Sequence, residues 1–143
     1  MTIGDIVFVN GAGREQRLRP LTVRQVCTMQ RVLASRKAAA CAEDCRAVGI
    51  DPADALKAVA AVRDQCALTS TLIRWCFETD GAYAIIAEAC QPRTDAEVNA
   101  AVEGMTPDEL TEVALQLVGF EWDASAGKWK SRAAMTSDRA IGS

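Results

Sequence analysis

The fold of this chain is decided by residues 23–79, VRQVCTMQRVLASRKAAACAEDCRAVGIDPADALKAVAAVRDQCALTSTLIRWCFET. The stretch is rich in alanine, which has the highest helix propensity of all residues. Its single glycine and single proline lie together in Gly49-Ile50-Asp51-Pro52, which is typical of one helix ending and another beginning. The pattern therefore predicts two long helices, 23–48 and 53–78, that fold back on each other.

The first of these helices has a stripe of mostly small residues along one face. At about 100° per residue, seven positions fall within an arc of about 80°, and Val26 and Leu33 extend that arc. The second helix is apolar on two faces, which is typical of a helix buried between neighbours. We expect it to pack on the stripe formed by Val23, Cys27, Gln30, Ala34, Ala38, Cys41 and Cys45.

Shorter elements are predicted on both sides of these helices. A β-prone run at 6–9 and a returning segment at 15–19, separated by turn residues, predict a small β-hairpin. A second small hairpin is expected at 120–130, with Trp122 and Trp129 paired across it. Start and stop signals predict three short helices, at 82–90, 95–103 and 107–118.

These elements define a mainly α fold. It consists of a long antiparallel helical hairpin, shorter C-terminal helices and small β-hairpins near both ends. The length of 143 residues predicts one domain. We expect residues 1–130 to form a single helical domain with an N-terminal β-hairpin, and residues 131–143 to form a flexible tail.

The charges are distributed unevenly along the chain. Residues 1–37 hold seven Lys/Arg against two Asp/Glu, residues 38–123 hold five against sixteen, and residues 124–143 hold four against one. Basic ends around an acidic body argue against a nucleic-acid-binding domain, which is usually basic over a whole face. They suit docking on an acidic partner or head-to-tail contact between copies in a homo-oligomer, although charge runs more often only solvate a terminus.

The sequence begins without the pattern of a secretory signal, and no apolar segment approaches about 18 residues. We therefore expect no membrane contact and a cytosolic location, in which the six cysteines are mostly reduced. No constellation for catalysis is visible, because the chain has no histidine and a single tyrosine, Tyr83. Cys41 and Cys45 share a helix face but lack the further ligands of a zinc site. We expect no catalytic residue, no cofactor and no metal.

Cysteine is the residue type with the most chemical potential here. If the two long helices turn near residue 51, Cys27 and Cys76 are about equally far from the turn. We therefore predict that these two thiols are neighbours and form a candidate thiol pair. A disulfide between them requires a Cα separation below about 7 Å.

Three stretches carry a family resemblance. They are Leu18-Arg19-Pro20-Leu21-Thr22, Asp80-Gly81-Ala82-Tyr83, and Thr106-Pro107-Asp108-Glu109-Leu110 with its continuation to Val118-Gly119. In this order, residues 15–119 resemble the small helical tail-assembly chaperones of tailed bacteriophages. The resemblance implies a non-enzymatic protein of the host cytoplasm that holds tail components or other virion proteins during assembly. The alternatives are a structural subunit that stays in the virion, and a thiol-based redox protein.

Overall fold

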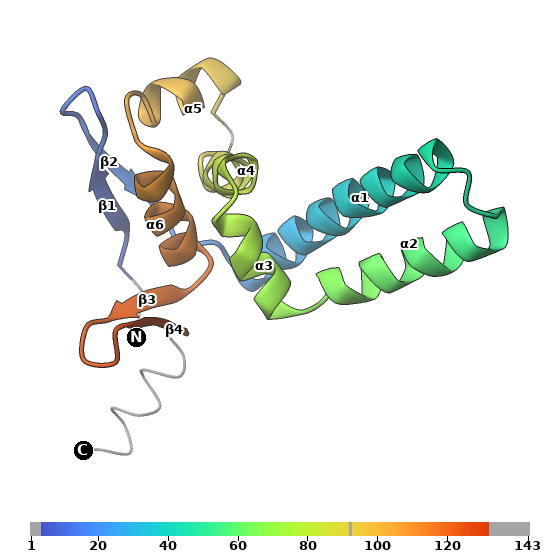
Figure 1. Cartoon of the computed structure of the whole chain (residues 1–143). Coiled ribbons are helices and arrows are strands. Elements are labelled where there is room, and N and C mark those ends of the chain that lie inside the picture. Colours follow the sequence, from blue (N-terminus) through green and yellow to red (C-terminus); the bar gives the residue numbers. More distant parts are fainter. Residues whose placement is uncertain (1–3, 92, 132–143) are drawn as a thin grey trace. The chain divides into compact units, whose positions relative to one another are not determined.

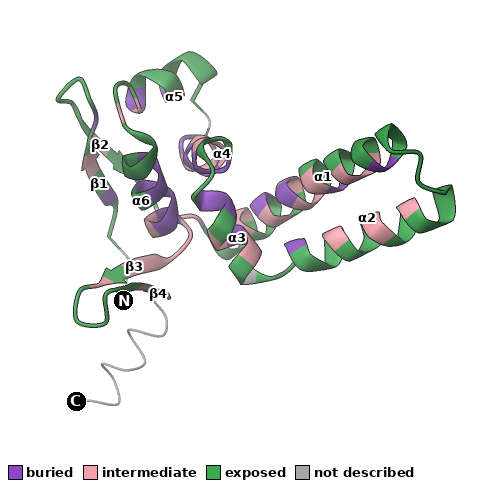
Figure 2. Ribbon diagram, in the orientation of Figure 1, coloured by how far each residue is buried: buried purple, intermediate pink, exposed green. Residues whose placement is uncertain are grey.

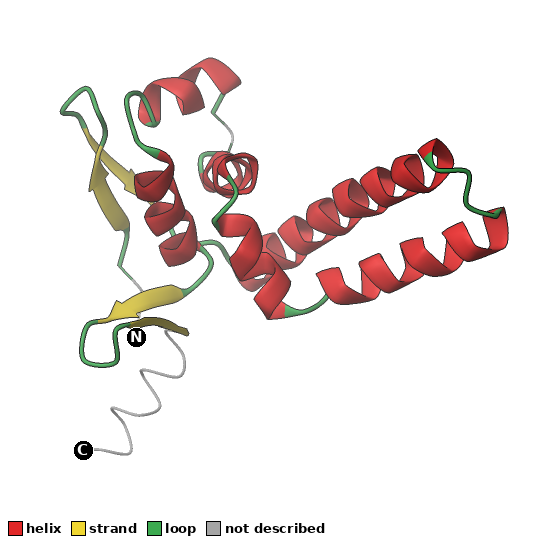
Figure 3. Cartoon of the chain, in the orientation of Figure 1, coloured by secondary structure: helices red, strands yellow, loops and turns green. Residues whose placement is uncertain are grey.

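The computed structural model describes residues 4–91 and 93–131 (Figure 1). Within these ranges the chain is mainly helical, with six helices and two small antiparallel strand pairs (Figure 3). This confirms the predicted mainly α fold with small β-hairpins. The predicted tail lies outside the described residues except for Ser131, which belongs to the last strand. The chain divides into two compact units, Val23–Trp75 and a second unit made from the segments before and after it.

The unit Val23–Trp75 is built from α1 (Val23–Ala47), α2 (Pro52–Cys66) and most of α3 (Thr69–Cys76). α1 and α2 pack against each other. The Trp75 side chain is buried, and the Arg36 guanidinium lies 5.6 Å from the centroid of its ring, a cation–π distance. The buried apolar side chains of this unit are Met29, Leu33, Ala38, Cys45, Cys66, Leu72 and Trp75.

The single second helix predicted over 53–78 is not confirmed, because α2 ends at Cys66 and α3 begins at Thr69. Neither glycine nor proline causes this break. The Leu68 N–H donates to the Gln65 carbonyl at 3.0 Å, a 3₁₀-type bond that closes the last turn of α2. The Thr71 hydroxyl donates to the same carbonyl at 2.7 Å. These bonds satisfy an orphan carbonyl at the end of α2, so the chain changes direction without a breaker residue.

The stripe predicted on α1 is buried only in part. Ala38 and Cys45 are buried, whereas Val23 is 83% exposed and Cys27 is also exposed. The early end of α2 explains the difference, because Cys66, its last residue, lines the same groove as Cys27. The first turn of α1 therefore lies beyond the reach of α2.

The second unit is organised around α6 (Pro107–Leu117), whose inner face is buried almost without interruption (Figure 2). It packs against α4 (Thr79–Ala89), against β1 (Ile6–Val9), which pairs with β2 (Glu15–Leu18), and against β3 (Phe120–Asp123), which pairs with β4 (Lys128–Ser131). α5 (Asp95–Ala101) contacts α4. The largest buried side chains here are Leu115, Leu117, Ile85, Ile86 and Val98.

The starts of two helices follow the sequence signals closely. The Thr106 hydroxyl accepts the Glu109 N–H at 3.2 Å and donates to the Glu109 carboxylate at 3.0 Å, which is a complete capping box before α6. Thr94 and Glu97 make the same reciprocal contacts before α5. The start of α4 was predicted wrongly, because it begins at Thr79 and takes in Gly81, a residue we interpreted as an interruption.

The turn between β1 and β2 is fastened to α5 by one buried side chain. The Asn10 side-chain nitrogen donates to the carbonyls of Ala100 and Ala101, both at 3.2 Å. Its side-chain oxygen accepts the N–H groups of Ala12 and Arg14, both at 3.0 Å. Asn10 therefore closes its own turn and also satisfies two of the last carbonyls of α5, which have no partner within the helix.

Candidate functional site: an aromatic and acidic groove on α6

A groove of about 500 Å³ lies on the outward side of α6. Asp108, Thr111 and Glu112 are spaced so that they share one face of this helix. Thr111 forms part of the floor and is only 8% exposed, whereas both carboxylates are exposed. The residues that line the groove are Phe77, Asp108, Thr111, Glu112, Gln116, Trp122 and Trp129.

Two tryptophans form one wall of this groove. Trp122 on β3 and Trp129 on β4 are direct cross-strand partners, as the sequence predicted. Their ring centroids are 5.7 Å apart and their planes meet at 70°, the edge-to-face arrangement that aromatic quadrupoles favour. Trp122 is 53% exposed and Phe77, between α3 and α4, is 60% exposed. Two large aromatic side chains at the groove therefore have uncovered surface.

The β3–β4 turn holds the tryptophans in place. One oxygen of the Asp123 carboxylate accepts hydrogen bonds from the Ser125 hydroxyl at 2.6 Å and the Ser125 N–H at 3.0 Å. The other oxygen lies 2.8 Å from the Lys130 ammonium. Hydrogen bonds from Lys130 and then from Ser125 hold the pKa of the Asp123 carboxyl well below its ordinary value. Asp123 is therefore ionised at neutral pH and pins the turn from both sides.

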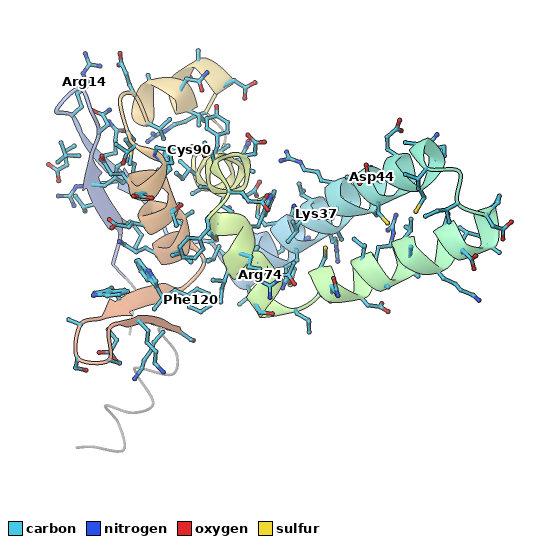
Figure 4. All side chains as sticks on the ribbon, viewed as in Figure 1. Arg14, Lys37, Asp44, Arg74, Cys90 and Phe120 are labelled. Carbon is cyan, nitrogen blue, oxygen red and sulfur yellow. The ribbon has the colours of Figure 1, made fainter. Side chains whose placement is uncertain are left out.

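The described residues that line the groove differ in chemistry. They offer aromatic rings, two carboxylates, a hydroxyl and an amide. Carboxylates beside aromatic faces attract cationic groups, because both present negative charge or negative π-density to the ligand. Figure 4 labels Phe120 at the start of β3, the strand that carries Trp122.

The candidate thiol pair is divided between the two units. Cys27 is exposed on α1, and Cys76, at the end of α3, is fully buried. Both are free cysteines. Their proximity stays a prediction. Within its own unit, Cys27 lies instead with Cys66 in a groove of about 310 Å³ that also contains Arg31 and Arg63.

The remaining thiols behave as small apolar side chains. Burial raises the pKa of Cys66 and of Cys90, and it raises the pKa of Cys76 to about 12. Burial, followed by a hydrogen bond to Cys45, raises the pKa of Cys41. Among residues 4–91 and 93–131, no group of three or more Cys, Asp or Glu side chains is placed to hold a metal ion. The described helices include none that is long and apolar enough to cross a membrane.

Sequence reasoning found the tryptophan pair but missed the groove to which it belongs. The signal was available in α6, where Asp108 and Glu112 are exposed and lie four residues apart on the helix. The contribution of Phe77 was not visible, since we predicted one continuous helix over residues 53–78, whereas Phe77 lies between α3 and α4. Comparison of the chain with protein-family models, curated proteins and solved structures finds no match.

Proposed function

We propose that this protein is a non-enzymatic assembly or interaction protein that holds a segment of a partner protein in the α6 groove. The observation that carries the proposal is the exposure of Phe77 and Trp122 at a groove of about 500 Å³. Aromatic side chains bury about 150–250 Å² each and dominate interface energetics, so two exposed aromatic side chains at one groove favour a protein contact there. Aromatic residues are also enriched at the centres of interfaces.

The resemblance to tail-assembly chaperones of tailed bacteriophages gives this proposal its biological setting. The partner is then a phage tail component or another virion protein, and the protein acts in the host cytoplasm. The proposal includes the long antiparallel helical hairpin, with α1 and α2 as its two arms. Exposed Val48, Ile50 and Leu56 give those arms a second apolar surface for a partner or for another copy.

The test is co-expression of the protein with tail components of a tailed bacteriophage, followed by co-purification. We expect Phe77→Ala combined with Trp122→Ala to lose at least about tenfold of the captured partner, since each removed aromatic anchor costs more than about 1.4 kcal/mol. Leu68→Ala is the matched control, because Leu68 is also an exposed apolar residue and lies outside the groove. Equal capture by all three proteins contradicts the proposal.

The structural-subunit alternative is favoured by one observation. The outward face of the β1–β2 hairpin carries exposed Val7 and Val9, which a permanent neighbour would cover. Mass spectrometry of purified particles separates the two functions, because a chaperone is absent from them and a subunit is present at fixed copy number. The redox alternative predicts loss of partner capture when all six cysteines are replaced by alanine, whereas both assembly functions predict none.

A further inference from the structure

The charge of the α6 groove is one-sided. Asp108 and Glu112 are four residues apart on α6, so their backbone positions are about 6 Å apart along the helix axis. Among the described residues that line the groove there is no Lys or Arg. The same groove is lined by Trp122 and Phe77, which are both exposed. A ligand in this groove therefore meets both carboxylates and aromatic rings.

We propose that the groove selects a basic segment of the partner protein, with two Lys or Arg side chains about 6 Å apart and an apolar side chain beside them. This inference rests on the proposed function and adds the chemistry of the partner. Successive same-face residues of an extended strand are about 6.6 Å apart, which matches the spacing of Asp108 and Glu112 along the helix axis. A Lys or Arg side chain in this groove can pair with a carboxylate and can also contact an aromatic ring. An acidic segment is repelled by the same two carboxylates.

A separate protein suits this groove better than a second copy of the chain. Among the described residues, the β1–β2 hairpin is one exposed basic element, with Arg14 at its turn (Figure 4). On its outward face, however, Arg17 lies 3.3 Å from the Glu15 carboxylate. The charge of Arg17 on this face is therefore offset by Glu15, whereas two adjacent cations are needed to match the two carboxylates of the groove.

The test uses a library of random dodecapeptides panned on the folded protein. We expect the wild type to enrich peptides with paired Lys or Arg next to an aromatic or aliphatic residue. The Asp108→Lys, Glu112→Lys variant should bind those peptides at least about tenfold more weakly and should instead enrich acidic peptides. The matched control is Asp44→Lys, Asp64→Lys, which changes the net charge equally at exposed positions outside the groove and should select like the wild type.

A second variant distinguishes a loss of charge from a loss of folding. Asp108→Asn with Glu112→Gln keeps the side-chain shapes and should weaken the selected peptides in the same direction, with helical content unchanged by circular dichroism. If this variant binds like the wild type while Trp122→Ala loses binding, the charge inference is wrong and the interaction site stands. If neither variant changes binding, the proposed function fails as well.

Two other occupants would overturn the inference. A wild-type mass that rises with concentration, and that returns to the monomer when Asp108→Asn and Glu112→Gln are combined, would identify a second copy as the occupant. Much tighter peptide binding after removal of residues 132–143 would identify the end of the chain itself. The expected result is a wild-type mass that does not rise with concentration, and peptide binding that is unchanged by removal of residues 132–143 and weaker at high salt.

Discussion

Gly11 and Gly104 meet backbone to backbone, although 93 positions separate them in the chain. A Cβ atom built on Gly11 would collide with the Cα, carbonyl carbon and oxygen of Gly104. A Cβ on Gly104 would lie 2.9 Å from the Gly11 Cα. The Gly11 N–H also donates to the Glu103 carbonyl at 2.7 Å. The two glycines allow the β1–β2 turn to rest directly on the connection between α5 and α6.

We therefore expect Gly11→Ala to reduce the free energy of unfolding by about 1 to 3 kcal/mol, the usual cost of overpacking a close contact. Gly104→Ala should cost more, because Gly104 also has a φ of +72°, which side chains disfavour. Gly4→Ala is the control, since a Cβ there meets nothing within 4 Å. Urea unfolding midpoints measure the difference, and equal midpoints for Gly4→Ala and Gly11→Ala would refute the close contact.

Replacing Asn10 by aspartate tests the anchor between the turn and α5. The substitution keeps the shape but turns two N–H donors into an oxygen that faces the Ala100 and Ala101 carbonyls. We expect a loss of about 2 to 3 kcal/mol at neutral pH, because a buried polar contact is left unpaired. Repulsion by the carbonyls raises the pKa of the new carboxyl, so the loss should shrink as the pH falls towards about 4.

The matched control for this experiment is Asn99→Asp on the same helix. Asn99 uses its side-chain oxygen to accept the Tyr83 hydroxyl at 2.7 Å, a role that aspartate retains. Its unfolding free energy should change little. A similar loss of unfolding free energy in both variants would show that a general charge effect on α5 outweighs the Asn10 hydrogen bonds.

The β3–β4 turn should weaken in acid. The pKa of Asp123 is lowered in the folded state, so its stabilising contribution is present above the unfolded value of about 3.9 and disappears as the pH falls through the folded value. Near-ultraviolet circular dichroism of the tryptophan pair should therefore fade below about pH 4. The Asp123→Asn variant should not show this loss of signal at low pH. An unchanged loss in that variant would mean that another carboxyl group causes it.

The thiols should differ sharply in reactivity. Cys27 is exposed, whereas burial raises the pKa of Cys76 to about 12. With a thiol reagent at about pH 8 we expect rapid modification of Cys27 and none of Cys76 until the chain unfolds. Mass spectrometry of the modified peptides gives the order. Fast modification of Cys76 would mean that its surroundings open readily.

The same burial predicts a loss of stability in alkali. An unfolded thiol ionises near its ordinary pKa of 9.0, while folded Cys76 stays neutral until the pH approaches about 12. Its contribution is therefore complete below about pH 9 and falls as the pH rises towards about 12. Cys76→Ala should flatten this part of the pH profile of the unfolding free energy. A profile identical to that of the wild type would contradict the assignment.

The helix starts and the hairpins could be predicted because their signals are local. Thr106 and Glu109, three residues apart, define a capping box without help from the rest of the chain. The cross-strand pairing of Trp122 with Trp129 follows from a short turn between two β-prone segments. Such features depend on neighbouring residues, and a sequence displays them directly.

The break between α2 and α3 could not be predicted, because its causes are not local propensities. Leu68 and its neighbours favour a helix or tolerate one, and the break coincides with the burial of Leu72 and Trp75. The role of Asn10 was hidden for a similar reason. Asn-Gly is an ordinary turn signal, and its second task depends on carbonyls 90 and 91 positions away. The groove combines three separate segments, so periodicity within one segment could not indicate it.

The distance along the chain between Asn10 and Ala100 has a consequence for synthesis on the ribosome. The two positions are 90 residues apart, which corresponds to about 5 to 18 seconds of translation at common elongation rates. During that interval the strands that carry Ile6 and Leu18 exist without the helices that cover them, and a lone two-stranded hairpin is marginal in water. The β1–β2 hairpin is therefore open to aggregation during that interval.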